Sequence, residues 1–310
     1  SHAPSFLLKQ LNLARQSANP SWAEYLARRA IEVDPEYPDA VAALGLLLLD
    51  LHRFGEALDY FDRYCELKPT DFQTLNNIGA FLGRYGRLKE AARHYRVALG
   101  VNPDCAEAHS NLGMILSMQG DQQRAMKHLE QARELQPRNA EVLTNLGTVA
   151  ARLHDYERSR RHYHEALKAD PRFTAAHYGL GVLQSALGRY EEAMQHFEQA
   201  LETRPDDHNT AERMAWLLAT CPDEKIRDGE RAVGLAARAI EVEAGGDLRF
   251  AHTLSAAYAE AGRFDEAKET LEKAIAEARE KGRDKLAARF EESLSMYERG
   301  QPLRQAAKSH

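Results

Sequence analysis

Apolar residues along positions 106–139 recur three or four residues apart, which is the spacing of one face of an α-helix. The pattern is interrupted once, at Gly120-Asp121, and an aspartate at this point is well suited to cap the start of a second helix. Pro137 ends the second apolar run. Because only two or three residues separate the runs, the segment is predicted to fold as an antiparallel helix pair. A pair this small buries too little surface to be stable alone, so it needs a neighbour on each side.

The same pattern recurs along the chain every 34 residues. Prolines mark the end of each unit, at Pro35, Pro69, Pro103, Pro137, Pro171 and Pro205. Glycines share one position in the first helices, at Gly45, Gly79, Gly113, Gly147 and Gly181. Bulky residues share one position in the second helices, at Phe61, Tyr95, Leu129, Tyr163 and Phe197. Glycine lets two helices approach closely and a bulky side chain fills the space beside it, so the two columns predict a close contact within every hairpin.

These columns resemble the tetratricopeptide repeat (TPR), whose period is also 34 residues. The Leu-Gly step, as at Leu112-Gly113, and the later series of alanine, bulky residue, alanine and proline carry the resemblance over about residues 4–281. The tryptophan often found early in the family's first helix is missing. The resemblance implies an all-α fold: an α-α superhelix, a right-handed TPR solenoid of about eight helical hairpins plus a C-terminal capping helix, with the first helices lining its concave side. The segment around residues 215–239 also resembles a variant common in bacterial TPR proteins, so a bacterial source is expected.

The predicted array has eight units, of which the first and seventh are irregular. They are residues 4–37, 38–71, 72–105, 106–139, 140–173, 174–207, 208–247 and 248–281. The seventh unit carries an insertion of about five residues within 220–229, and a longer inter-helix loop can project a binding edge. Residues 284–299 place apolar side chains on one face and are predicted to cap the last unit. The polar residues 300–310 are predicted to be disordered.

Composition narrows the classes of partner. The net charge of −6 over 310 residues and the lack of a basic stripe argue against nucleic-acid binding. Three scattered cysteines exclude a disulfide framework and a zinc site of the usual spacing. No apolar stretch reaches the length of a membrane span, so no membrane insertion of this segment is expected. The chain begins Ser1-His2 without methionine, and we expect the natural protein to extend upstream. The cytoplasm is the favoured compartment, with a periplasmic or membrane-anchored location in a longer chain as the alternative.

Candidate binding residues lie on the first helices. Asn77, Asn111 and Asn145 share one helical phase and are predicted to form a ladder along the concave groove. An amide side chain has both a donor and an acceptor, which suits it to hold the backbone of a peptide. The alternative is that each asparagine only bridges to the next repeat. The other predicted groove residues are Asn76, Arg84, Met114, Met118, Thr148, Arg152, Tyr178 and Trp216. Methionine and tryptophan suit an adaptable apolar ligand, although Trp216 fits core packing equally well.

No motif of an active site is present, and we expect neither catalysis nor a cofactor. Four histidines stand one repeat apart, at His94, His128, His162 and His196. The repeat spacing is too long for them to share a metal ion, so a solvated or half-buried ladder that gains charge near pH 6.5 is expected. The predicted function is a scaffold or adaptor that binds a peptide segment of a partner protein in its groove. The alternatives are the substrate-recruiting arm of a larger enzyme, such as a glycosyltransferase, and a bacterial envelope-assembly scaffold that self-associates.

Overall fold

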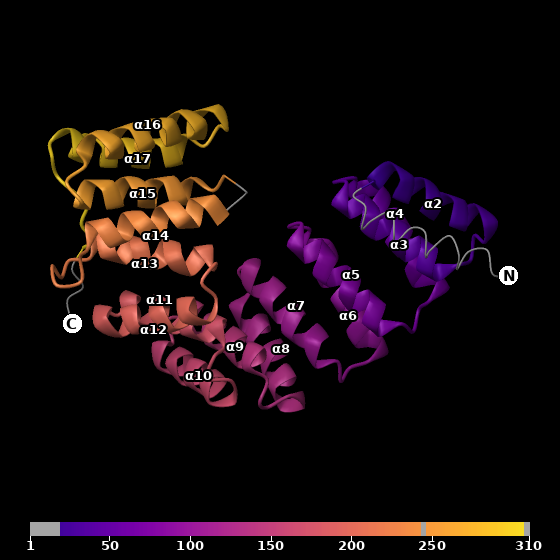
Figure 1. Cartoon of the computed structure of the whole chain (residues 1–310). Helices are drawn as coiled ribbons and strands as arrows, with labels where there is room; N and C mark the ends of the chain where they lie inside the picture. Colours follow the sequence, from indigo (N-terminus) through magenta and orange to yellow (C-terminus); the bar gives the residue numbers. More distant parts are fainter. Residues whose placement is uncertain (1–18, 243–245, 307–310) are drawn as a thin grey trace. The chain divides into compact units, whose positions relative to one another are not determined.

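The computed structural model describes residues 19–242 and 246–306, and within these ranges it contains sixteen helices and no strand. The helices follow one another as antiparallel pairs joined by short turns (Figure 1). The predicted all-α fold of repeated helical hairpins is therefore confirmed. The first helix expected for residues 4–37 falls on positions 4–18, outside the described residues.

The chain divides into two compact units, residues 1–137 and residues 138–310. The described helices of the first unit are α2 (Pro20–Val33), α3 (Pro38–Asp50), α4 (Phe54–Leu67), α5 (Phe72–Arg84), α6 (Leu88–Val101), α7 (Ala106–Met118) and α8 (Gln122–Leu135). Those of the second unit are α9 (Ala140–Arg152), α10 (Tyr156–Ala169), α11 (Thr174–Ala186), α12 (Tyr190–Thr203), α13 (His208–Thr220), α14 (Gly229–Val242), α15 (Leu248–Glu260), α16 (Phe264–Glu280) and α17 (Asp284–Glu298).

The glycine column creates the contact inside each hairpin. A Cβ atom added at Gly113 would lie 2.8 Å from Cγ of Leu129 and 3.1 Å from the carbonyl oxygen of Ala125. At Gly181 it would lie 2.5 Å from Cε1 of Phe197, a ring that is 1% exposed. The two helices thus approach to a distance that leaves no room for a methyl group. This confirms the pairing of glycine and bulky columns predicted from the sequence.

Side-chain caps mark where several helices begin. Asp71, Asp121 and Asp155 each precede a helix and accept a hydrogen bond from the backbone N–H three residues later, at 3.0, 3.1 and 3.1 Å respectively. Each cap satisfies one of the N–H groups that a helix start leaves without a partner. Asp121 therefore caps α8, as the sequence predicts.

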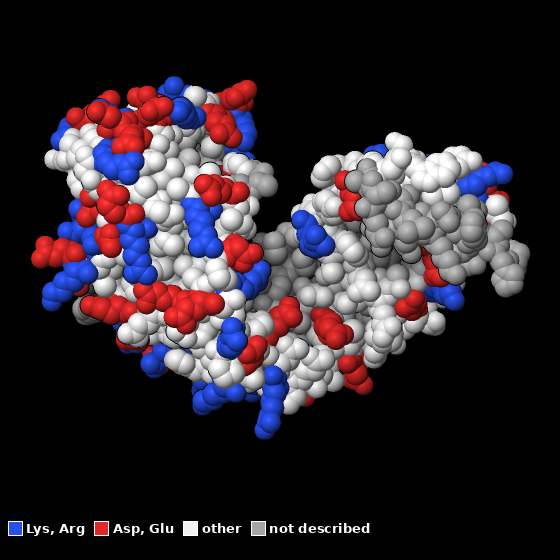
Figure 2. Space-filling model, in the orientation of Figure 1, with Lys and Arg blue, Asp and Glu red and all other residues white. Residues whose placement is uncertain are grey.

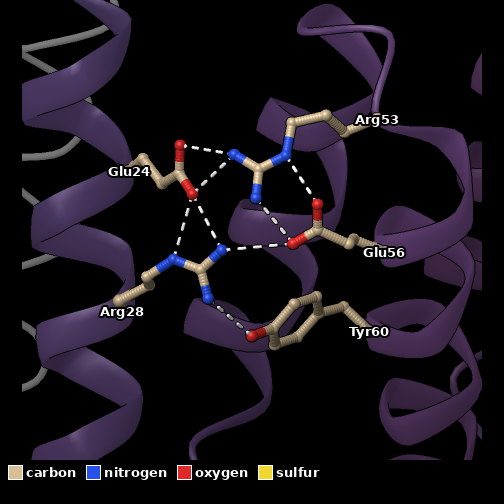
Figure 3. A network of polar contacts seen from close by, with 5 residues as sticks. All are labelled: Glu24, Arg28, Arg53, Glu56 and Tyr60. Carbon is tan, nitrogen blue, oxygen red and sulfur yellow. Dashed lines mark hydrogen bonds and ion pairs between the residues drawn. The ribbon is translucent and has the colours of Figure 1, made fainter.

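An ion-pair network joins α2 to α4 at the N-terminal edge of the first unit (Figure 3). Glu24 accepts from Nη2 of Arg28 at 2.8 Å and from Nη1 of Arg53 at 2.8 Å. Arg53 also donates to both oxygens of Glu56, at 2.7 and 2.6 Å, and Arg28 donates to the hydroxyl of Tyr60 at 3.3 Å. Partial burial opposes ionisation of Glu24, but the hydrogen bonds from the two arginines lower its pKa overall.

The insertion in the seventh unit does not project as the sequence led us to expect. Ile226 packs against the core of the second unit. Arg227 donates to the carbonyl oxygens of Cys221 and Pro222 at 3.0 and 3.2 Å, and its Nε donates to Glu260 on α15 at 2.9 Å. Residues 220–229 thus fold back onto α15, and the expectation of a projecting binding edge is corrected.

The C-terminal residues close the second unit. Helix α17 packs on α16 and buries Phe290 and Tyr297, each 1% exposed, in a cluster with Leu271. This is the capping helix that the sequence predicts. Residues 300–306 differ from the expected disorder, since the backbone N–H of Gln305 donates to the carbonyl oxygen of Thr220 at 2.8 Å. Residues 307–310 lie outside the described part of the chain.

Candidate functional site

In the first unit, Asn111 forms a side-chain hydrogen bond with an asparagine of the preceding repeat. Its Nδ2 donates to Oδ1 of Asn76 at 3.3 Å, so the two side chains bridge α7 and α5. For Asn111, this contact corresponds to the alternative in which the asparagine bridges two repeats. Asn77 is exposed on α5, and Met118 is 56% exposed on α7.

Two further predicted groove residues of the first unit lie beside these. Arg84 is exposed, with its guanidinium 5.8 Å from the ring centre of Phe81, and Met114 is half-buried. The first unit therefore presents scattered polar and apolar side chains on its first helices.

In the second unit, four predicted residues line one cavity. A cavity of about 500 Å³ lies against α9 and α11 and is lined by Asn145, Thr148, Arg152 and Tyr178. Most of its remaining lining is alanine, valine, leucine and tyrosine. The hydroxyl groups of Thr148 and Tyr163 lie 3.1 Å apart at its wall. Burial raises the pKa of Tyr163, so this phenol stays neutral at physiological pH.

Two more cavities adjoin the first along the second unit. One of about 190 Å³ shares Val182 and Ala186 with the first cavity and also touches Trp216 and Gln305. The next, about 500 Å³, shares Trp216 and Gln305 with the second. Because neighbouring cavities share lining residues, the three lie in a row along the first helices α9, α11, α13 and α15. We call this feature the unit 2 groove.

Trp216 combines the two roles that the sequence left open. It is half-buried against the core of the second unit, and it lines two of the three cavities. Its ring centre is 5.1 Å from that of His252, which in turn hydrogen-bonds to Ser293 at 3.1 Å. Burial, with a smaller effect of Arg289, lowers the pKa of His252 to about 4. The His252 side chain in this part of the groove is therefore neutral at pH 7.

Several groove residues were not predicted. Ala186 lines two cavities and lies eight residues after Tyr178 on α11, so extending the same helical face would have found it. His252 and Ser293 come from α15 and α17 and carry no signal in the repeat pattern. Gln305 belongs to the segment for which disorder was expected.

A concavity on α10 is a less suitable binding site. It measures about 770 Å³ and is lined by one face of α10, with residues Glu157, Arg160, Arg161, His164, Glu165, Leu167 and Lys168. Acidic and basic side chains alternate here, and Arg160 pairs with Glu157 at 2.6 Å. Figure 2 shows the same interspersion of both signs over α13–α17 on the face in view. Such mixed charge gives phosphate groups no basic stripe to bind.

Neither a metal site nor a membrane-spanning helix is found in the described part of the chain. Among residues 19–242 and 246–306, no group of three or more potential metal ligands is present. Within the same ranges, no helix is both long and apolar enough to span a bilayer.

The histidine column differs from the expected titrating ladder. His94 and His162 are fully buried, at 1% and 2% exposure. Burial lowers the pKa of His94 to about 4, and burial together with His177 lowers that of His196 to about 4. Burial and His109 likewise lower the pKa of His128. The repeat position determines the helical phase of a residue but not its depth of burial. The prediction that these histidines gain charge near pH 6.5 is therefore wrong for His94 and His196.

Helical hairpins that present a groove on their first helices define a class of protein-interaction scaffold. Sequence models described as tetratricopeptide repeat match residues 8–72 and 144–208, residues 70–138, and residues 248–281. The chain belongs to the tetratricopeptide repeat family, whose members are generally non-catalytic scaffolds for protein–protein interaction. No curated protein matches the chain.

Solved structures share the fold at low sequence identity. One, from Pseudomonas aeruginosa, is described as the functional characterisation of pilF; it is 19% identical, with 69% of this chain and 97% of that chain covered and a TM-score of 0.52. The APC/C heterotetramer Cut9–Hcn1 is also 19% identical, with 80% of this chain and 48% of that chain covered and a TM-score of 0.58. At this identity the two structures support the fold alone.

Proposed function

We propose that the unit 2 groove binds an extended segment of a partner protein. The observation that carries the proposal is the row of three neighbouring cavities along α9, α11, α13 and α15, because cavities in a row can receive successive side chains of one extended chain. The two larger cavities, about 500 Å³ each, are of the size that accommodates bulky side chains.

The lining residues suggest how such a segment would be held. Asn145 lines the first cavity, and an amide side chain has both a donor and an acceptor to offer a peptide backbone. Tyr178 and Trp216 supply aromatic surface that buries apolar area with little loss of side-chain entropy. Arg152 at the rim favours an acidic or carbonyl-rich stretch beside the apolar residues.

In the first unit we propose a weaker contribution from Asn77 and Met118. Both are exposed on first helices, where each can contact a protein segment bound to the first unit. Asn111 already pairs with Asn76, so its exchange for alanine should affect α5–α7 packing more than ligand binding.

A library of random peptides panned against the full chain, followed by calorimetry, tests the proposal. Selected segments should bind the Asn145→Ala/Tyr178→Ala double variant at least tenfold more weakly than the parent, since each large lost contact is worth roughly 1–2 kcal/mol. Gln195→Ala is the control, because Gln195 is exposed on the second helix α12 and lines none of the three cavities. Equal affinity for all three proteins would remove the groove as the binding site.

A further inference from the structure

Residues 303–306 already form part of the wall at the C-terminal end of the unit 2 groove. Leu303, Arg304, Gln305 and Ala306 line the cavity beside Trp216, together with residues of α13, α15 and α17. The chain from residue 301 to residue 306 continues from the end of α17 without forming a helix or strand. Its last four residues therefore reach the groove as an irregular segment of the chain itself.

Three kinds of contact hold this segment, and each is specific. The backbone N–H of Gln305 donates to the carbonyl oxygen of Thr220 at 2.8 Å, and its side-chain Nε2 donates to the hydroxyl oxygen of Thr220 at 2.7 Å. Arg304 forms an ion pair with Glu260 at 2.5 Å, and that carboxylate is only 12% exposed. Leu303 packs against two hydrophobic clusters of the second unit, one around Leu217 and one around Phe290.

Two of the side chains that receive the segment keep another partner when it leaves. Glu260 also accepts from Arg227 at 2.9 Å, so the loss of Arg304 does not leave a buried charge alone. Thr220 donates its hydroxyl hydrogen to the carbonyl oxygen of Trp216 at 2.6 Å, independently of Gln305. Because a buried group without any partner is what makes such a departure costly, this site permits exchange of its occupant.

We propose that residues 301–306 are an intramolecular ligand of the groove, and that the external ligand of the Trp216 site has the same chemistry. That ligand is an extended protein segment with an aliphatic side chain followed by a guanidinium group and then an amide. The inference rests on the proposed function, since it names the class of partner for one end of the same groove. A tethered segment acts at an effective concentration of roughly millimolar, so an external segment binds only when it outcompetes the tether.

Release of the segment by a charge reversal tests the proposal in the full chain. Arg304→Glu places a carboxylate beside Glu260 and should free the segment, whereas Arg299→Glu makes the same charge change on an exposed residue outside the groove. All variants carry Trp22→Phe, which leaves Trp216 as the only tryptophan of the two in the chain. The probe is a fluorescently labelled peptide with the sequence of residues 300–306.

With Arg304→Glu, the emission of Trp216 should shift to longer wavelength, and the peptide should bind at least tenfold more tightly than to the parent. Arg299→Glu should match the parent in both measurements. Adding Glu260→Gln to the Arg304→Glu protein should weaken peptide binding again. Equal peptide affinity for Arg304→Glu, Arg299→Glu and the parent would overturn the inference. In that event, library-selected segments that still depend on Asn145 and Tyr178 would leave the proposed function standing.

Discussion

Gly229, at the start of α14, lies at a close approach of this helix to the end of α15. A Cβ atom added there would lie 2.5 Å from the backbone nitrogen and 2.7 Å from the Cα of Ala261, and 2.7 Å from the carbonyl carbon of Glu260. These are backbone atoms at the end of α15, so no side-chain rotation can relieve the overlap. Gly234 lies on the same helix, and a Cβ atom there would meet nothing within 4 Å.

Replacing each glycine by alanine should therefore give effects of opposite sign. Gly234→Ala should stabilise the protein by about 0.5–1 kcal/mol, because alanine is the better helix former. Gly229→Ala should destabilise it by about 1–3 kcal/mol, because the helix must move away from the end of α15 to relieve the overpacking. The gap between the variants is then about 1.5–4 kcal/mol, or roughly 1–2 M in the urea midpoint at a slope near 2 kcal/mol/M.

The assay is urea unfolding followed by the fluorescence of Trp216 in a Trp22→Phe background, which reports on the second unit alone. Repeat proteins can unfold in parts, so the midpoint of this local signal is the quantity to compare. An equal gain of stability in both variants would contradict the overlap expected at Gly229, because it would mean that α14 does not approach the end of α15 so closely.

Three other outcomes follow from the structure. Since the folded-state pKa of about 4 for His94, His196 and His252 lies below the usual 6.5, the unfolded chain binds more protons between these values. The stabilisation that depends on these neutral histidines should thus be complete above pH 6.5 and should fall on acidification, by about 2 kcal/mol per histidine at pH 5. A urea midpoint that stays constant from pH 7.5 to pH 5 would contradict these pKa values. Glu24→Gln should cost about 1 kcal/mol and reduce the salt dependence of unfolding, whereas Glu32→Gln, whose carboxylate pairs with Arg29 at the exposed surface, should change stability little. Equal effects of the two substitutions would contradict the network. Gly181→Ala should destabilise the α11–α12 hairpin because its Cβ atom would overlap the buried ring of Phe197, and a gain in melting temperature would count against that contact.

The repeat pattern predicted those parts of the fold that depend on local spacing. The close contact of Gly113 with Leu129, the cap at Asp121 and the capping helix α17 all follow from positions within one or two units. For the candidate site, the predicted phase placed Asn145 and Tyr178 on the wall of one cavity.

Other features depend on residues far apart in the sequence, and the pattern could not reveal them. The insertion packs inward because Arg227 meets Glu260, 33 residues away, and the segment with Gln305 is held by Thr220, 85 residues away. Asn111 bonds to Asn76 because the packing of α7 on α5 brings different phases opposite one another. Periodicity identifies which face of a helix a residue occupies, but the neighbouring helices decide its depth and its partner.

Photo-crosslinking with a library-selected segment tests directly whether the unit 2 groove holds the partner. A benzophenone side chain introduced in place of Tyr178 lies at the groove, whereas one in place of Gln195 lies on a second helix outside it. Because Tyr178 lines the groove, the segment should crosslink at position 178, and an excess of unlabelled segment should abolish the adduct. Efficient crosslinking at position 195 with none at position 178 would contradict the claim that the groove on the first helices holds the partner.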